Sequence, residues 1–169
     1  SITYGVGAGP GWAYPDQLDR MLGPGWDVRN FGHSGASVAK AEQHPIWSQK
    51  EYKSALEVHP DVVVIVATVR ALKLHGGVPL KELGKPNVEA LDKGVENLKK
   101  HIENIHRFGL PVVVAINSFT SDTPEEIAFI QDKCAYLSVK IVPANHWAHG
   151  GAGAEDLARI VTFGFRGEA

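Results

Sequence analysis

The stretch HPDVVVIVATVRALKLHGG, residues 59–77, decides the fold of this chain. Its first half is a run of β-branched residues, which is typical of a strand buried on both faces in a parallel sheet. The strand opens after His59-Pro60, because the residue before a proline avoids the helical region and so ends a helix there. Ligands of open parallel sheets gather beyond the carboxyl ends of the strands, so we expect residues 68–77 to form part of a functional site.

Helical and strand patterns alternate from this strand to the end of the chain. The clearest helical pattern spans residues 87–109, where apolar residues recur at three- and four-residue steps and a glycine stands at the exit. Further strands are predicted in LPVVVAIN (110–117) and VKIVPAN (139–145), and a terminal helix in AGAEDLARIV (152–161).

The residues between the second and third of these strands predict a capped helix. Thr123 is a preferred N-cap residue, Pro124 fits the first helical position, and Glu126 completes a capping box three residues after the cap. We expect this helix to run to about Leu137.

The same reading of the amino-terminal part predicts helices in AYPDQLDRML (13–22) and SQKEYKSALEVH (48–59), and a short strand in WDVRNFG (26–32). Buried strands that alternate with amphipathic helices indicate βαβ units. The predicted fold class is therefore α/β: a three-layer α/β/α sandwich with a mostly parallel sheet, formed by a single domain over residues 1–169.

Composition excludes several classes of function. Lys and Arg number 17 against 19 Asp and Glu, for a net charge of −2, and no stretch concentrates basic residues, so nucleic-acid binding is not expected. Cys134 is the only cysteine, which excludes an internal disulfide and a cysteine-based zinc site. The apolar runs are too short to span a membrane, and a single cysteine favours a reducing compartment, so we expect a cytoplasmic protein. The expected partner is a small-molecule substrate. The opening Ser1, without Met, suggests a chain truncated at its N-terminus.

Residues 1–65 resemble the SGNH (GDSL) family of serine esterases and lipases, through SITYG (1–5) and NFGHSGAS (30–37). The resemblance implies that Ser1 is the nucleophile and that Gly35 lends a backbone N–H to an oxyanion hole. A serine of this kind needs a histidine and a carboxylate to activate it. The family's Asp-x-x-His pair and the Asn after its third strand are both missing here, so the triad is incomplete.

Residues 62–163 resemble formate–tetrahydrofolate ligase, which makes 10-formyltetrahydrofolate from formate, ATP and tetrahydrofolate. Four motifs come in the order and spacing of that family: VATVRALKLHGG (66–77), NVEALDKGVENLKKHIENI (87–105), FGLPVVVAINSFTSDTPEEI (108–127) and HWAHGGAGAEDLA (146–158). One such match would be weak, whereas four in register are specific.

This second resemblance implies a role for three residues beyond the ends of the predicted strands. Phe119 and Trp147 would stack on the two faces of the pterin, and Arg70 would bind formyl phosphate, the presumed intermediate of the family. Other roles stay open: Phe119 packed under its loop, Trp147 capping the core, and Arg70 solvated or in a salt bridge.

Neighbouring residues are weaker candidates. A surface role is expected for Lys73 and for His75. The Gly76-Gly77 and Gly150-Gly151 pairs either let backbone N–H groups approach an anion or form turns. Asp122 is expected to help start the helix that follows it.

The ATP site of the ligase family is not evident in this sequence. That site depends on Gly-x-x-x-x-Gly-Lys-[Ser/Thr], whose backbone N–H groups and lysine hold the phosphates. The only Gly-Lys pair, Gly84-Lys85, is followed by Pro86. Because this loop is missing, we expect the chain to lack ligase activity on its own. The resemblance still implies tetrahydrofolate and ATP as substrates. No metal is predicted.

Three functions follow from these observations. The first is a partial formate–tetrahydrofolate ligase that carries the folate and formyl-phosphate segment. The second is a serine esterase that uses Ser1, and the third is an inactive chimera of the two families, joined near residues 60–66. The oligomeric state is left open.

Overall fold

The computed structural model describes residues 10–31 and 48–164. The chain divides into two compact units, one up to Pro60 and one from Asp61, and each is described by itself. Within the described residues, no helix combines the length and the apolar character that a membrane span requires.

The first unit contains the helices α1 (Tyr14–Leu22) and α2 (Lys50–Leu56), which confirm both predicted amino-terminal helices. The strand predicted in WDVRNFG is wrong, since its described residues, 26–31, have no strand structure. The backbone N–H of Val28 donates to the Asp19 side chain at 3.1 Å. The Asp19 side chain, on α1, therefore accepts the hydrogen bond that the Val28 N–H would have donated to a neighbouring strand in a sheet.

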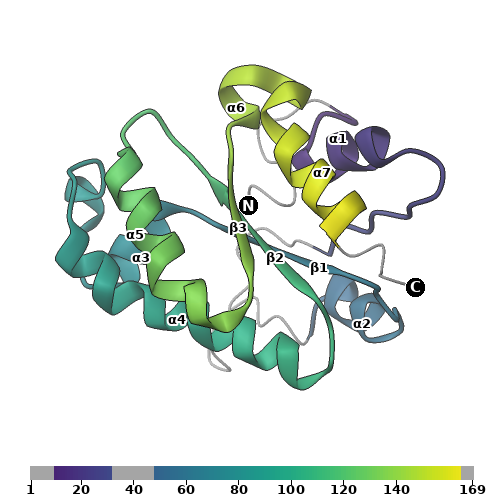
Figure 1. The fold of residues 1–169 in the computed structure, drawn as a ribbon, viewed down its shortest axis with the longest axis horizontal. Helices are drawn as coiled ribbons and strands as arrows, with labels where there is room; N and C mark the ends of the chain where they lie inside the picture. Colours follow the sequence, from purple (N-terminus) through teal and green to yellow (C-terminus); the bar gives the residue numbers. More distant parts are fainter. Residues whose placement is uncertain (1–9, 32–47, 165–169) are drawn as a thin grey trace. The chain divides into compact units, whose positions relative to one another are not determined.

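The second unit is built on three parallel strands, counted over its described residues: β1 (Val63–Ala67), β2 (Val112–Asn117) and β3 (Lys140–Ala144). Their order in the sheet is β1-β2-β3 (Figure 1). Every residue of the central strand β2 is buried, whereas every residue of β1 is half-buried. This confirms β2 as a strand buried on both faces, whereas β1, which was predicted to be buried in the same way, is half-buried along its whole length.

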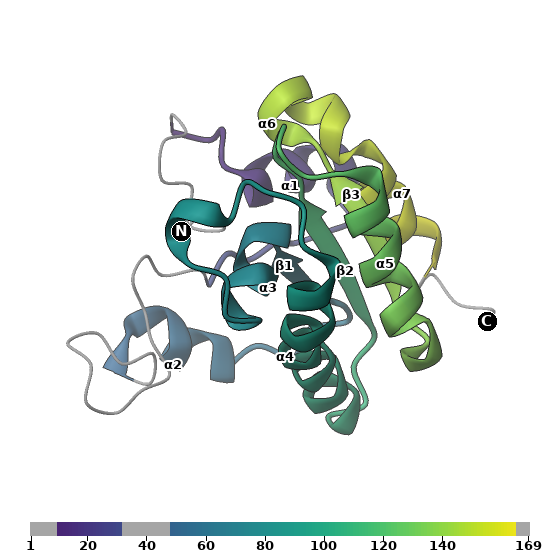
Figure 2. The ribbon, with the colours of Figure 1, turned by 90° about the vertical axis from the view of Figure 1, so that its left-hand side faces the viewer.

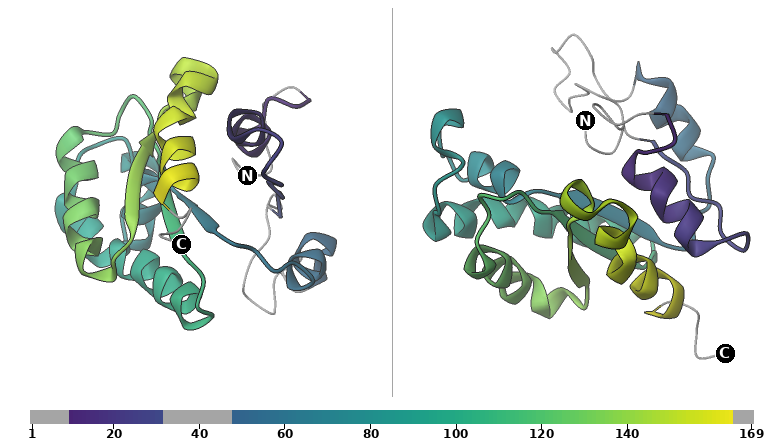
Figure 3. Two further views of the ribbon diagram at one scale, coloured as in Figure 1. Left: turned by 45° about the vertical axis from the view of Figure 1, so that its right-hand side comes forward. Right: turned by 90° about the horizontal axis from the view of Figure 1, so that it is seen from above.

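Helices cover both faces of this sheet. The helices α3 (Val69–His75), α4 (Val88–Arg107) and α5 (Pro124–Cys134) pack on one face, and α7 (Glu155–Gly164) lies on the other (Figure 3, left). One buried cluster joins the first three helices to alternate residues of β2, namely Val112, Val114 and Ile116. The α/β class and its three layers are thus confirmed for the second unit.

The predicted starts of α4 and α5 are confirmed by the hydrogen bonds that cap them. Thr123 and Glu126 form the reciprocal capping box at the start of α5. At the start of α4, the Asn87 side chain accepts from the backbone N–H of Ala90 at 2.9 Å. The α5 helix ends at Cys134, and a short 3-10 turn, Ala135–Leu137, continues to the predicted end.

The helix α3, which was not predicted, follows β1 almost at once. Thr68 caps it by accepting a hydrogen bond from the backbone N–H of Ala71 at 3.0 Å. The helix ends at Gly76, whose N–H donates to the Leu72 carbonyl at 2.9 Å. The N–H of Gly77 donates to Leu74 in the same way at 3.0 Å. Gly76 and Gly77 therefore form the turn that ends α3. Their N–H groups donate to carbonyls of that helix, so they are not free to bind an anion.

The helices α3 and α4 lie against each other (Figure 2). Their backbones come closest at two glycines. A Cβ atom on Gly94 would lie 1.8 Å from the Leu72 carbonyl oxygen, and one on Gly76 would lie 1.9 Å from the Ala90 carbonyl oxygen. The two backbones are thus close enough that only hydrogen fits at either position. This contact fixes α3, and with it Arg70, against the long helix α4.

Candidate functional site

The carboxyl ends of the strands place three of the predicted site residues, Arg70, Phe119 and Trp147, at one edge of the sheet. Arg70 lies in the first turn of α3, directly after β1. Phe119 follows the last residue of β2, Asn117, and Trp147 lies in α6 (His146–His149), directly after β3. The Ser118 N–H donates to the Ala144 carbonyl at 3.3 Å, so the segments that leave β2 and β3 start side by side.

Phe119 is held in a closed turn before α5. Its backbone N–H donates to the Asp122 carboxylate at 2.9 Å, and the Asp122 N–H donates back to the Phe119 carbonyl at 3.0 Å. Asp122 was expected to help start α5, but the cap of that helix is Thr123. The carboxylate of Asp122 instead fixes the backbone that carries the aromatic ring.

Arg70 contacts this turn directly. Its guanidinium carbon lies 4.7 Å from the centre of the Phe119 ring, and Nη2 donates to Ser121 Oγ at 3.1 Å. A guanidinium within about 6 Å of a ring centre makes a cation–π interaction. Arg70 and Phe119 are therefore brought together, by a direct stacking contact that the sequence did not predict.

Two buried polar atoms at this edge have no hydrogen-bond partner among the described residues: Nε of Arg70 and Oδ1 of Asn117. Asn117 is 3% exposed, at the last position of β2. Buried polar atoms are satisfied in the great majority of cases, so each exception calls for an explanation. One is a donor and the other an acceptor, as the recognition of a polar ligand would require.

The remaining predicted site residues are not tested by the structure. The backbone of Trp147 is helical, but its side chain lies outside what the structure describes. Ser1 and Gly35, proposed for an ester hydrolase, both lie outside the described residues. Among the residues that are described, no group of His, Cys, Asp and Glu side chains is placed to hold a metal ion.

The surface role expected for Lys73 is wrong. Its side chain is 0% exposed and forms an ion pair with Glu126, also 0% exposed, at 3.0 Å. The ammonium group also donates to the Lys85 carbonyl at 3.0 Å. The helical spacing of α3 turns this lysine inward, and the sequence pattern did not reveal the helix. His75, at the end of the same helix, is exposed as expected.

Glu126 is the hub of this buried network. Its Oε1 accepts from Lys73 and from the backbone N–H of Asn87 at 3.0 Å, and its Oε2 accepts from the Thr123 N–H at 3.1 Å. Burial alone would raise the pKa of Glu126, but the hydrogen bonds from Lys73 and the two backbone donors outweigh it and lower the pKa below its ordinary value. A lowered pKa keeps the carboxylate charged near neutral pH, where it accepts these three hydrogen bonds.

We expect this network to make stability depend on pH in the acid range. Because the pKa of Glu126 is lowered in the folded chain, its contribution is present above the ordinary glutamate pKa and is lost as the pH falls through the folded value. Urea denaturation from about pH 7 to about pH 3 should show a smaller loss of stability for Glu126→Gln than for the wild type. Equal losses in the two proteins would contradict a charged, paired Glu126.

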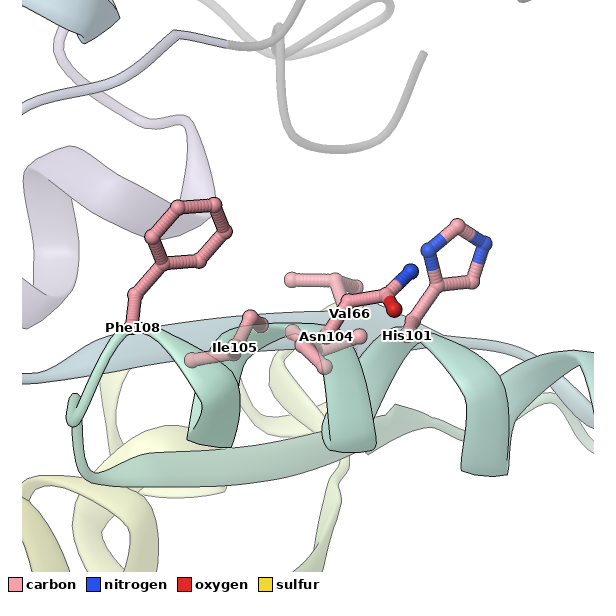
Figure 4. A pocket seen from close by; sticks show the side chains of 6 residues that line it. Val66, His101, Asn104, Ile105 and Phe108 are labelled. Atoms are coloured by element: carbon pink, nitrogen blue, oxygen red, sulfur yellow. The ribbon is translucent and has the colours of Figure 1, made fainter.

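A groove elsewhere in the second unit does not belong to this site. It has a volume of about 360 Å³ and lies between β1 and α4, with Ile65, Val66, His101, Asn104, Ile105 and Phe108 as its lining. Figure 4 shows Phe108, Asn104 and His101 along the part of α4 that approaches its carboxyl end. The lining is mainly apolar and includes neither Arg70 nor the turn of Phe119.

Comparison with known proteins extends the resemblance read from the motifs. The family model for formate–tetrahydrofolate ligase matches residues 50–167, a range that begins ahead of residue 62, where the motifs placed it. The ligase of Methylibium petroleiphilum is 54% identical over 105 residues, which are 62% of this chain and 19% of that protein. Ligases of a Methylobacterium species and of Lacticaseibacillus paracasei are each 60% identical, over 103 and 102 residues, in both cases 60% of this chain and 18% of the relative.

The range matched by the family model includes the strands of the sheet, the turn of Phe119 and the Lys73–Glu126 pair. The chain spans about a fifth of the length of the relatives, since the aligned residues make up 18–19% of them. Because the family model matches most of this chain, residues 50–167 of 169, the chain belongs to the formate–tetrahydrofolate ligase family.

Proposed function

We propose that this chain binds tetrahydrofolate at the carboxyl edge of the sheet, as the folate and formyl-phosphate segment of a formate–tetrahydrofolate ligase. The observation that carries the proposal is the Phe119 ring, which a closed turn holds at the end of β2 with Arg70 stacked on it at 4.7 Å. Family membership supplies the substrate class, and the geometry supports a flat ligand at this ring.

The pterin is a flat heteroaromatic ring, and stacking on an aromatic side chain adds about 0.5–1.5 kcal/mol beyond the burial of area. Arg70 covers one face of Phe119, so we assign the pterin to the opposite face. Trp147 would be the second aromatic partner, since α6 leaves β3 beside the segment that leaves β2.

Arg70 would carry the second part of this function. One of its nitrogens is engaged by Ser121, while Nε has no partner among the described residues. A planar guanidinium with an unused donor can bind a phosphate oxygen in a charge-assisted hydrogen bond. Formyl phosphate, the presumed intermediate of the family, would be the anion.

We infer that activation of formate by ATP needs residues beyond these 169, because the sequence contains no Gly-x-x-x-x-Gly-Lys-[Ser/Thr] loop. The proposed role of this chain is therefore limited to binding, and the synthesis of 10-formyltetrahydrofolate belongs to a longer protein. The ester-hydrolase alternative depends on Ser1 and Gly35 and stays a prediction.

Binding is tested by titrating the full chain with tetrahydrofolate and following tryptophan fluorescence together with the heat of binding. We expect the ligand to quench fluorescence, Trp147→Ala to abolish the quenching, and Phe119→Ala to weaken binding by about tenfold or more through loss of stacking and burial.

Two matched substitutions serve as controls for this titration. Trp12→Ala removes an exposed tryptophan of the first unit, and Phe108→Ala removes an exposed phenylalanine at the end of α4. Both variants should bind as the wild type does. Absence of binding by the wild type, or equal binding by Phe119→Ala and Phe108→Ala, would overturn the proposal.

A further inference from the structure

We infer that the buried Lys73–Glu126 ion pair positions Arg70 against Phe119, and so sets the geometry of the folate site without contacting the ligand. The inference deepens the proposed function and rests on it for its binding measurement. The contact between Arg70 and Phe119 can be measured without any ligand, so that part of the test does not depend on the proposed function.

The lysine side of the pair is connected to Arg70 through one helical turn. Lys73 follows Arg70 by three residues in α3, and residues at this spacing lie on the same side of a helix. Lys73 Nζ is held by Glu126 and by the Lys85 carbonyl, both at 3.0 Å. A shift or rotation of α3 would break these bonds, so they fix the position from which the Arg70 side chain extends.

The glutamate side of the pair is connected to Phe119 through the start of α5. Glu126 Oε2 accepts from the Thr123 N–H at 3.1 Å, as part of the capping box. The preceding residue, Asp122, holds the N–H of Phe119 at 2.9 Å. The same carboxylate thus binds α3 directly and fixes the backbone next to the turn that carries the aromatic ring.

Energetics favour a positioning role over one in overall stability. A buried ion pair contributes little net stability compared with apolar residues of similar volume, because both charges lose their hydration. What such a pair supplies is a defined geometry between the elements that it joins. The hydrogen bonds of the described residues show that the pair joins α3 to the loop at Lys85, to the cap of α4 and to the start of α5.

The test replaces both charges together. In Lys73→Met/Glu126→Gln the volumes are retained, no charge is left unpaired, and the glutamine can still accept from a backbone N–H. The matched control is Lys93→Met/Glu89→Gln, the same substitutions at an ion pair of 3.1 Å on the exposed side of α4. Glu126→Asp is the second variant, which keeps the charge and shortens its reach.

Each variant of the full chain is examined by circular dichroism, by the NMR resonance of the Arg70 Nε–H group, and by tetrahydrofolate titration. We expect the ring current of Phe119 to shift that resonance upfield in the wild type, because the Arg70 guanidinium lies over the ring. In the folded double variant we expect the resonance to move toward its position in an unstructured peptide and the affinity to fall by about tenfold or more. The control should match the wild type in both.

A folded double variant with the wild-type resonance and affinity would overturn the inference. If the double variant does not fold, Glu126→Asp decides the question by the same two measurements. If the wild type does not bind tetrahydrofolate, only the proposed function is overturned. The Arg70 resonance still shows whether the Lys73–Glu126 pair sets the contact between Arg70 and Phe119.

Discussion

Replacing Glu126 with leucine is expected to lower the free energy of unfolding by about 3–5 kcal/mol, the typical loss when one partner of a buried ion pair is removed. The substitution leaves the Lys73 ammonium buried with the Lys85 carbonyl as its remaining partner. It also leaves the N–H groups of Asn87 and Thr123 without the acceptor that they have in the wild type. Urea denaturation followed by circular dichroism measures the loss.

The control for this substitution is Glu125→Leu, one residue earlier, where the side chain is exposed. It should cost about 1 kcal/mol or less, from a weaker interaction with the start of α5. Adding Lys73→Met to Glu126→Leu should restore part of the lost stability, because the unpaired charge is removed as well. Additive losses in that double variant would show that the two side chains are not coupled and would contradict the network.

Gly94→Ala should have the second large effect on stability. A Cβ atom at this position would lie 1.8 Å from the Leu72 carbonyl oxygen, which belongs to the backbone of α3 and cannot turn aside. The two helices must move apart, and overpacking typically costs about 1–3 kcal/mol and occasionally more. The contact of 1.8 Å with backbone places this substitution at the upper end of that range. This outweighs the gain of about 1 kcal/mol that alanine normally brings to a helix interior. The midpoint of urea denaturation should fall accordingly.

Gly84→Ala is the matched control, because a Cβ atom there meets nothing within 4 Å. Its stability should stay within about 0.5 kcal/mol of the wild type. A Gly94→Ala protein as stable as the control would mean that α3 and α4 do not cross as closely as described. Arg70 would then lack the support that fixes it at the site.

The parts of the fold that the sequence predicts are those governed by local patterns. The β-branched runs of β1 and β2 predict strands, and the periodic apolar residues of α4 predict a helix with one buried face. The capping box at Thr123 and Glu126 was predicted because both partners lie within one turn. These features need no knowledge of residues far along the chain.

The parts that escaped prediction depend on distant residues. The helix α3 spans only Val69–His75, too short for its periodicity to stand out, and it is stabilised by its crossing with α4. The burial of Lys73 depends on Glu126, 53 residues further along the chain. Nothing in the local sequence distinguishes such a lysine from an exposed one, so a surface role was the natural expectation.

The site, like the fold, has features that the sequence predicts and others that only the tertiary structure shows. Its place at the carboxyl edge of the sheet follows from the parallel topology, and the residue types follow from the family motifs. The stacking of Arg70 on Phe119, and the closing of the turn by Asp122, are tertiary contacts that sequence spacing does not encode. The two unsatisfied atoms, on Arg70 and Asn117, likewise became visible only in the structure.

The most direct measurement of the central claim is a crystal structure of the chain with tetrahydrofolate bound. We expect the pterin to lie between the rings of Phe119 and Trp147, with the centre of each ring about 4.5–7 Å from the centre of the pterin and Arg70 on the other face of Phe119. A pterin bound away from the Phe119 turn, or the Trp147 ring directed into the core on the far side of the sheet, would contradict it.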